Sequence, residues 1–279
     1  MAHSISLHTK RRSILVGALA LLAFSFVNIL PADAASVQEV KARGKIIVGI
    51  QGDNAPWGFI NSSGVQDGYD ADIAKLFGKE LGVAVEFAPL AVANRIPALV
   101  TGKVDILFAT MAMTEERAKS IQYSKPYAAN TIALYAPKQD AIKSPADLAG
   151  KEVGVPRSSI QDKAVTDAAP NATVRRFDDD AATIQALLSG QVQAVGGNQF
   201  YGQRLNASKP DMYERKITFT AVYNGAGSRL GERDWNEAAN AFIDKIKANG
   251  ELAKVYQKWM GEEPPEFPSS LPNIPFTVK

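Results

Sequence analysis

Apolar runs and amphipathic segments alternate along most of this chain of 279 residues. Residues 45–50 form a short run rich in β-branched side chains, which is typical of a buried strand. Residues 70–81 have apolar side chains at helical spacing and stop at Gly82, a common helix end. The same order then recurs, with strands predicted at 83–87, 104–109, 151–155, 174–177 and 192–195, and helices at 95–100, from 159 onward, and at 179–188, 235–249 and 251–260. Strands that alternate with helices predict α/β architecture with parallel sheets.

The alternation falls into two series. The second series begins at Ser144-Pro145, a pattern typical of a helix start with proline at its first position. Two series suggest two α/β lobes. Beyond residue 260 the chain is rich in proline, which predicts either an extended strap across the surface or a partly disordered tail.

The first 35 residues resemble a signal peptide. Basic residues at 10–12 precede an apolar run that reaches Leu30, and Ala32-Asp33-Ala34 supplies a small-residue cleavage site. The alternative is a transmembrane anchor, because the run approaches the ~20 residues that cross a bilayer. Pro31 after the run favours cleavage. We therefore predict a cleaved signal peptide at residues 1–35 and a periplasmic location, with export by either the general or the twin-arginine route.

Cleavage would change the chemistry available to the chain. Both histidines lie before residue 35, and the sequence has no cysteine. The remaining chain would lack imidazole and thiol groups, which excludes Ser-His-Asp and Cys-His catalysis, His or Cys metal sites, disulfides and a lipid anchor. It would hold 28 basic and 28 acidic residues after the loss of three bases and one acid, so nothing in its charge favours nucleic acid. We expect no cofactor and no metal.

Residues 68–73, GYDADI, resemble the signature of family 3 extracellular solute-binding proteins, the polar amino-acid class that serves bacterial ABC importers. Ala71 is smaller than the usual residue there. Similar fragments follow in the family's order at residues 96–99, 102–105, 113–117, 123–127, 147–151, 250–252 and 258–259. The resemblance therefore covers almost the whole chain after the leader, and several ordered matches are far more specific than any one of them.

This resemblance implies a type II periplasmic-binding-protein fold, with two α/β lobes joined by two hinge strands and a ligand cleft between them. Lobe 1 would comprise residues 36–135 and 223–279, and lobe 2 residues 136–222. The hinge strands would lie near residues 135–138 and 221–223. The implied partners are a small amino acid or carboxylate ligand and an inner-membrane ABC permease with its ATPase. A monomer is expected.

Two arginines carry the main ligand prediction. Thr114 to Arg117 matches the family's Thr-x-x-Arg motif, whose arginine binds the ligand's α-carboxylate, and a guanidinium offers a planar pair of donors to a carboxylate. Arg95 resembles the arginine that meets the side-chain carboxylate in the glutamate/aspartate-binding branch. Two such arginines would suit an acidic amino acid. The alternative for Arg95 is a side chain that faces solvent or pairs with an aspartate.

Further positions match the family's ligand contacts more weakly. Ala109 and Thr110 match positions where the backbone and a small polar side chain touch the ligand. Ser159 matches a hydroxyl at a helix N-terminus, where an anion is favoured, although a plain helix cap explains it equally well. Asn54 and Trp57 match the cleft wall, and Trp57 would also suit the lobe core.

Several positions depart from the family pattern. Ala112 stands where serine or threonine is common, Ile160 replaces a frequent threonine, and Asn198 replaces an aspartate that binds the ligand's ammonium. Losing that charged acceptor would cost on the order of 1.5–3 kcal/mol. Either an aspartate among residues 178–180 compensates, or the ligand is not an ordinary α-amino acid. Arg157, where a smaller or neutral residue is common, would add an anion contact.

We interpret the chain as a periplasmic solute-binding protein, not an enzyme, that captures a polar amino acid for an ABC importer. Glutamate or aspartate is the favoured ligand. One alternative is a cyclohexadienyl or arogenate dehydratase-like enzyme on the same fold, for which the sequence offers no convincing general acid. The others are a binding protein for a carboxylate without an ammonium, and a sensory domain that works with a separate receptor.

Overall fold

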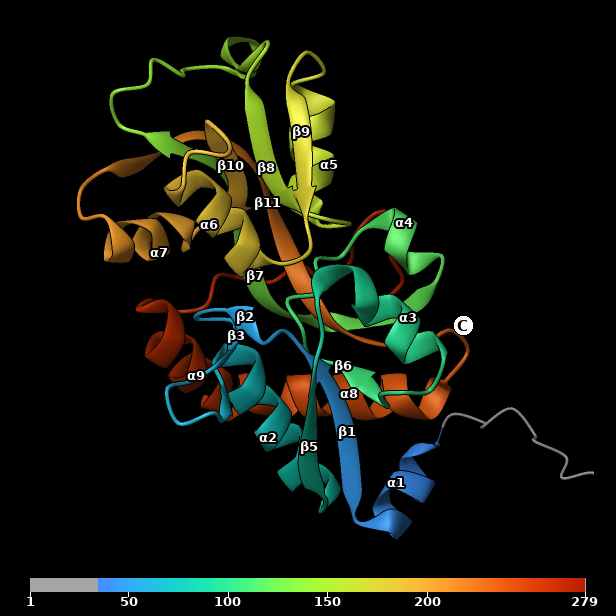
Figure 1. Ribbon diagram of the computed structural model, residues 1–279. Helices are drawn as coiled ribbons and strands as arrows, with labels where there is room; N and C mark the ends of the chain where they lie inside the picture. The colour runs from blue at the N-terminus through green and yellow to red at the C-terminus, as the bar shows by residue number, and fades with distance from the viewer. Residues whose placement is uncertain (1–34, 279) are drawn as a thin grey trace, which may run out of the picture. The chain divides into compact units, whose positions relative to one another are not determined.

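The computed structural model describes residues 35–278, and the remainder of the predicted signal peptide lies outside the described residues. Two long strands, β7 and β11, connect two α/β lobes (Figure 1). The strands are β1 (Lys45–Ile50), β2 (Asp53–Asn54), β3 (Gly58–Ile60), β4 (Gln66–Asp67), β5 (Ala84–Pro89), β6 (Ile106–Leu107), β7 (Ile121–Pro137), β8 (Glu152–Pro156), β9 (Thr173–Phe177), β10 (Ala194–Asn198) and β11 (Tyr213–Arg229).

The helices lie on the faces of the strands, and a side-chain cap marks the start of α1, α4, α5 and α6. They are α1 (Val37–Arg43), α2 (Tyr69–Leu81), α3 (Arg95–Val100), α4 (Glu115–Ala118), α5 (Ile160–Ala168), α6 (Asp180–Leu188), α7 (Tyr201–Ser208), α8 (Arg233–Ala248) and α9 (Glu251–Met260), with 3₁₀ turns at Val92–Asn94 and Pro145–Leu148. Helix α2 ends at Gly82, whose left-handed backbone is the predicted stop. The segment at Ser144-Pro145 forms a single 3₁₀ turn rather than the longer helix its cap suggests.

Parallel pairing is confirmed at both ends of the main sheet. Strand β1 pairs in parallel with β5 and β6, and β8 pairs in parallel with β9 and β10. The strand order is β5-β1-β6-β11-β7-β10-β8-β9, so the antiparallel pair of β7 and β11 lies between the two parallel groups. The hydrophobic pattern did not predict these two strands, and the family resemblance implied them only as hinge strands near residues 135–138 and 221–223. The sheet is therefore mixed rather than parallel throughout.

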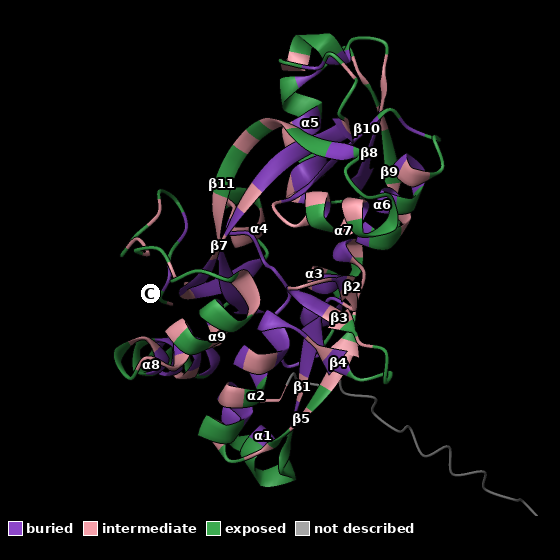
Figure 2. Cartoon of the chain, turned by 90° about the vertical axis from the view of Figure 1, so that its left-hand side faces the viewer, coloured by how far each residue is buried: buried purple, intermediate pink, exposed green. Residues whose placement is uncertain are grey.

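Each lobe has its own apolar core. In the first lobe, α1, α2, α8 and α9 bury side chains against β1, and a second cluster gathers α3, β6 and the C-terminal strap. In the second lobe, α5, α6 and α7 pack on β7, β8 and β10. Buried residues accordingly lie along the strands and on the inward sides of the helices (Figure 2). The strap is extended as predicted, and Ile274 and Phe276 anchor it in the first lobe.

Core packing suggests where the chain crosses between lobes. Tyr127 and Ala128 belong to a first-lobe core, whereas Ala133 and Leu134 belong to second-lobe cores. We therefore propose the first crossing at residues 129–132, a few residues before the 135–138 expected from sequence. The second crossing stays a proposal at 221–223.

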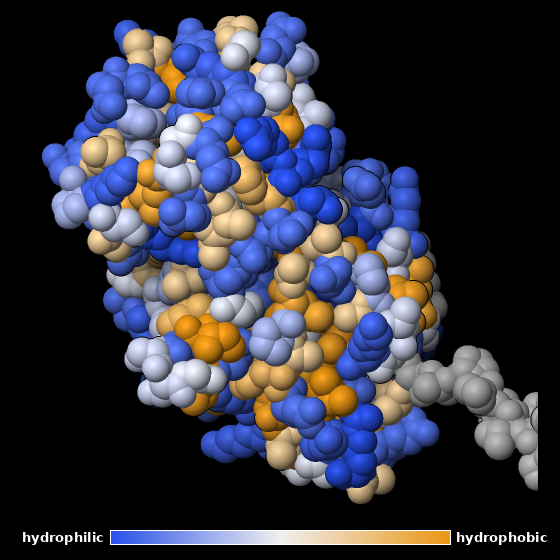
Figure 3. Space-filling view, in the orientation of Figure 1, coloured by the Kyte–Doolittle hydropathy of each residue, from blue (hydrophilic) through white to orange (hydrophobic). Residues whose placement is uncertain are grey.

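The surface adds little to the picture of the fold. On the face shown in Figure 3, apolar side chains lie in scattered groups among hydrophilic ones. Within residues 35–278, every helix is too short or too polar to cross a membrane.

Candidate functional site

An enclosed cavity lies between the two lobes, and five residues predicted from sequence line it. We call it the inter-lobe cavity. Asn54, Arg95, Thr110, Arg117 and Ser159 are those predicted residues. The described lining as a whole consists of Gln51, Asn54, Val92, Arg95, Thr110, Arg117, Asn130, Ser159, Ile160, Gln161 and Asp180.

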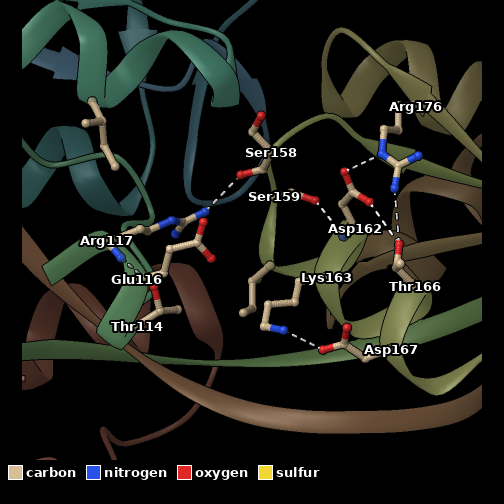
Figure 4. Close-up of a pocket in the computed structure, with 12 residues that line it drawn as sticks. Thr114, Glu116, Arg117, Ser158, Ser159, Asp162, Lys163, Thr166, Asp167 and Arg176 are labelled. Carbon is tan, nitrogen blue, oxygen red and sulfur yellow. Dashed lines mark hydrogen bonds and ion pairs between the residues drawn. The ribbon is translucent and has the colours of Figure 1, made fainter. Parts of the chain in front are cut away.

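Arg117 reaches the cavity from the first turn of α4. The hydroxyl of Thr114 accepts a hydrogen bond from the Arg117 N–H at 3.2 Å and caps this helix, which explains the spacing of the Thr-x-x-Arg motif. The guanidinium donates from Nη1 to the Ala112 carbonyl and from Nη2 to the Ser158 carbonyl, both at 3.1 Å. The second of these bonds joins the two lobes (Figure 4). With five N–H donors, Arg117 retains capacity for a carboxylate.

Arg95 is buried at the start of α3, with only 4% of its surface exposed. It donates from Nε to the Val92 carbonyl at 3.1 Å, and from Nη1 to the carbonyls of Ala109 at 2.5 Å and Thr110 at 3.2 Å. Its Nη2 has no hydrogen-bond partner within residues 35–278. Burial, and then the nearby Arg117, lower the pKa of Arg95 to about 9. The solvent-facing alternative is therefore wrong, and backbone carbonyls rather than an aspartate hold this side chain.

Asp70, the first acid of the GYDADI motif, holds the backbone of Thr110, which lines the cavity. Its Oδ2 accepts from the Thr110 N–H at 2.7 Å and from the Thr110 hydroxyl at 3.0 Å, and its Oδ1 accepts from the Tyr127 hydroxyl at 2.7 Å. Thr110 has a positive φ of 51°, which a non-glycine residue rarely adopts without support. Burial raises the pKa of Asp70 to about 6, against the effect of these hydrogen bonds. The motif therefore has a structural purpose that sequence reasoning did not identify.

The N-terminus of α5 faces the cavity from the second lobe. Ser159 caps this helix, because its hydroxyl accepts from the Asp162 N–H at 2.9 Å. Ser159 and Ile160 both line the cavity. The Ser159 hydroxyl therefore acts as a helix cap, as one of the two interpretations expected. The positive end of the α5 dipole also lies beside the cavity, where it would favour an anion.

Asn198 and Asn54 meet across the lobe boundary. The Asn198 amide donates from Nδ2 to Asn54 Oδ1 at 2.8 Å, and its Oδ1 accepts from the Phe200 N–H at 2.9 Å. Asn54 in turn donates to Gln51 Oε1 at 3.2 Å. Asn198 is fully buried and is absent from the described lining of the cavity. Asn198, which departs from the family pattern, therefore joins the two lobes in this conformation.

Asp180 is the acid that the structure places at the cavity. Its Oδ1 accepts from the Tyr201 hydroxyl at 2.5 Å and its Oδ2 accepts from Gln51 Nε2 at 3.0 Å. Burial, and then the carboxylate of Asp53, raise the pKa of Asp180 to about 6. Sequence reasoning could only place it among three neighbouring aspartates and missed Gln51 altogether, because no motif marks either position.

The other predicted residues do not line the cavity. Ala109 and Ala112 are buried behind it, and their carbonyls accept from the two arginines. Trp57 is fully buried in the first-lobe core, where its ring packs against the rings of Tyr69 and Phe200. Arg157 pairs with Asp178 on the surface instead of reaching an anion site. Trp57 and Arg157 are therefore outside the candidate site.

The cavity is closed in this conformation. Its volume of about 20 Å³ admits about one or two waters rather than an amino acid. Hydrogen bonds between the lobes keep the cavity closed. The Asp53 carboxylate accepts from the Ala181 N–H, the Asp53 backbone carbonyl accepts from Arg204, and Gln51 donates to Asp180. Ligand entry therefore requires the lobes to separate.

A larger groove adjoins the cavity at the same edge of the lobes. It has a volume of about 430 Å³ and shares Arg117, Ser159 and Ile160 with the cavity. Charged side chains of both signs surround it, among them Glu116, Lys163 and Arg176 (Figure 4). Arg117 therefore lines both the groove and the inter-lobe cavity.

Comparison with known proteins defines the class. Residues 46–262 match the profile of the bacterial extracellular solute-binding proteins, family 3, and the chain belongs to that family. It is similar to the ABC transporter glutamine-binding protein GlnH of Bacillus subtilis (strain 168), with 32% identity over 235 residues, 81% of this chain and 85% of GlnH. It is also similar to the L-cystine-binding protein TcyJ of Escherichia coli (strain K12), with 27% identity over 260 residues, 92% of this chain and 97% of TcyJ.

Solved structures confirm the type II binding-protein fold. An ancestral arginine-binding protein bound to glutamine has a TM-score of 0.75 at 35% identity, covering 79% of this chain and 99% of that protein. The ancestral amino acid-binding protein AncCDT-1, a precursor of cyclohexadienyl dehydratase, has a TM-score of 0.74 at 32% identity, covering 80% of this chain and 98% of its own.

Proposed function

We propose that this protein captures an amino acid in the inter-lobe cavity and delivers it to an ABC importer at the inner membrane. The observation that carries the proposal is the position of Arg117, which lines the cavity with donors to spare and faces the N-terminus of α5. A ligand carboxylate between these two groups would meet a guanidinium and a helix dipole together. The relatives named for glutamine, cystine and arginine support an amino acid as the ligand.

Capture would work by hinge closure. The bonds that join Arg117 to Ser158 and Gln51 to Asp180 form only when the lobes meet. A ligand that touches both lobes binds the closed form better than the open one, and this difference in affinity shifts the equilibrium. The permease would then recognise surfaces that both lobes present together. We place this event in the periplasm, where the family's proteins act outside the cytoplasm.

The charges around the cavity favour an acidic amino acid. The described lining has two positive side chains, Arg95 and Arg117, and one acid, Asp180. A ligand with two carboxylates and one ammonium would balance that set. Arg95 would meet the side-chain carboxylate through its unpartnered Nη2. We therefore keep glutamate or aspartate as the proposed ligand, although relatives are named for neutral and basic amino acids.

Arg95→Ala is expected to lower the affinity for glutamate about tenfold or more beyond its effect on glutamine, because one charge-assisted hydrogen bond is lost. The variant also frees the carbonyls of Val92 and Ala109, which weakens the site for any ligand. The ratio of the two dissociation constants, measured by titration calorimetry, cancels that shared effect. Equal losses for glutamate and glutamine would refute the side-chain role of Arg95.

A thermal-shift screen tests the proposed function. The protein, unfolded and refolded to remove bound ligand, is mixed with glutamate, aspartate, glutamine, arginine, histidine, cystine and carboxylates that lack an ammonium. A ligand at a thousand times its dissociation constant adds about 4 kcal/mol, or a few degrees for a chain of this size. A shift with glutamate or aspartate supports the proposal. A shift with other amino acids alone would correct the ligand, and a shift with the ammonium-free compounds alone would overturn amino-acid capture.

The likeness to AncCDT-1 makes an enzyme the second candidate function. Asp180 is a buried acid at the cavity with a raised pKa, which is a property of general acids. We propose binding rather than catalysis, because a buried carboxylate at the cavity can equally serve as a charged partner for a bound ligand. Incubation with prephenate and arogenate should give no product. Turnover that Asp180→Asn abolishes would replace the transport proposal.

A further inference from the structure

A bound amino acid needs an acceptor for its ammonium, and residue 198 does not supply one here. Asn198 is neutral, fully buried and outside the described lining of the cavity. Its amide nitrogen and oxygen are already engaged by Asn54 and by the Phe200 N–H. An ammonium beside this side chain would therefore find no negative charge, and an amide oxygen that already accepts one hydrogen bond.

We propose that Asp180, which lines the cavity from the second lobe, binds the ligand's ammonium instead. This inference rests on the proposed capture of an amino acid. Among the described residues that line the cavity, Asp180 is the only acid. Its two neighbours are engaged elsewhere, since Asp178 pairs with Arg157 on the surface and Asp179 accepts from the Ala182 N–H to cap α6.

The hydrogen bonds of Asp180 leave room for a ligand. A carboxylate offers about four acceptor positions, and Tyr201 and Gln51 occupy one on each oxygen. Asn130 supplies a second acceptor in the same cavity, because its Oδ1 is buried and receives no hydrogen bond within residues 35–278. An ammonium has three N–H donors and a positive charge. It could donate to both the Asp180 carboxylate and the Asn130 amide oxygen, and a neutral group would lack the charge that the carboxylate attracts.

The buried carboxylate of Asp180 also lacks a cationic partner among the described residues. Only 1% of its surface is exposed, and its side-chain hydrogen-bond partners among the described residues are the neutral Tyr201 and Gln51. Asp53 of β2 opposes its ionisation, while Arg204 of α7 and Arg95 of α3 favour it less strongly. A cation in the cavity would offset the cost of burying this carboxylate. A ligand ammonium is such a cation.

A competing explanation is that Asp180 merely latches the lobes through Gln51. A latch would act on every ligand equally, whereas an ammonium partner acts only on ligands that carry the ammonium. The two explanations therefore separate when an amino acid is compared with the same molecule without its amino group.

Asp180→Asn keeps the shape of the side chain and removes its charge. We expect it to weaken binding of L-glutamate and L-glutamine roughly 10- to 100-fold, and binding of glutarate and glutaramate by less than about threefold. The matched control, Asp178→Asn, removes the same charge two residues away on the surface and should leave all four dissociation constants unchanged. Equal losses with and without the amino group, or no loss at all, would overturn the proposal.

A second measurement needs no variant and covers the case in which Asp180→Asn does not fold. In the wild-type protein, the affinity for L-glutamine relative to glutaramate should fall about fourfold between pH 7.5 and 5.5, because an acid with a pKa near 6 becomes protonated and loses its attraction for the ammonium. A flat ratio would overturn the proposal. A wild-type protein that binds none of the amino acids would instead refute the proposed function, which is a different result.

Discussion

Replacing Arg117 by alanine is expected to weaken amino-acid binding at least ~100-fold while leaving the protein folded, because a charged partner of the ligand carboxylate is lost in a closed site. The guanidinium is held by the carbonyls of Ala112 and Ser158, at the end of a short surface helix, and contributes little to either core. Titration calorimetry gives the affinity, and thermal unfolding without ligand shows that the fold is retained.

The matched control is Arg157→Ala. This arginine precedes Ser158, the second-lobe partner of Arg117, but it pairs with Asp178 at the surface and does not line the cavity. Its removal should leave the affinity unchanged. Affinity close to the native value in Arg117→Ala, or an equal loss in the two variants, would refute the role of Arg117.

Asp70→Ala should have the largest effect on stability, with a loss of about 3 kcal/mol or more in the free energy of unfolding. The change leaves three buried donors without an acceptor, namely the Thr110 N–H, the Thr110 hydroxyl and the Tyr127 hydroxyl. It also releases the left-handed backbone of Thr110, which floors the inter-lobe cavity. Binding should therefore weaken even at temperatures where the variant is folded.

Asp72→Ala provides the comparison within the same motif. Asp72 accepts from Lys258 and Trp259 in a partly exposed pair, and removing such a pair costs about 1 kcal/mol or less. Urea unfolding measures both variants, with the midpoint and slope read together. A loss for Asp70→Ala no greater than that for Asp72→Ala would contradict the structural role we assign to Asp70.

The elements at both ends of the sheet could be predicted because their signals are local. The apolar run at β1 and the helical spacing of α2 ending at Gly82 depend on neighbouring residues only. The long pair β7 and β11 could not be predicted in the same way. Its strands mix apolar and polar residues, and they pair across about 90 residues of sequence, which only the tertiary fold decides.

The same distinction separates the parts of the site. Arg117 follows from a four-residue motif whose threonine caps its own helix, so the sequence contains both the residue and its support. Trp57 was ambiguous between cleft and core because a single aromatic residue fits both, and the core position became visible only with its neighbours in place. Asp180 meets Gln51 across 129 positions, and Asn198 meets Asn54 across 144. Such contacts between lobes leave no pattern in a single sequence.

The central claim, that this protein captures an amino acid by its carboxylate in the inter-lobe cavity, is tested most directly by calorimetric titration of the refolded protein. L-glutamate, L-glutamine, L-arginine, L-histidine and L-cystine would each be titrated beside the corresponding α-carboxyl methyl ester. We predict one-to-one binding of at least one free amino acid, and an ester of that amino acid that binds at least ~100-fold more weakly. Equal binding of acid and ester, or no binding of any amino acid, would contradict the claim.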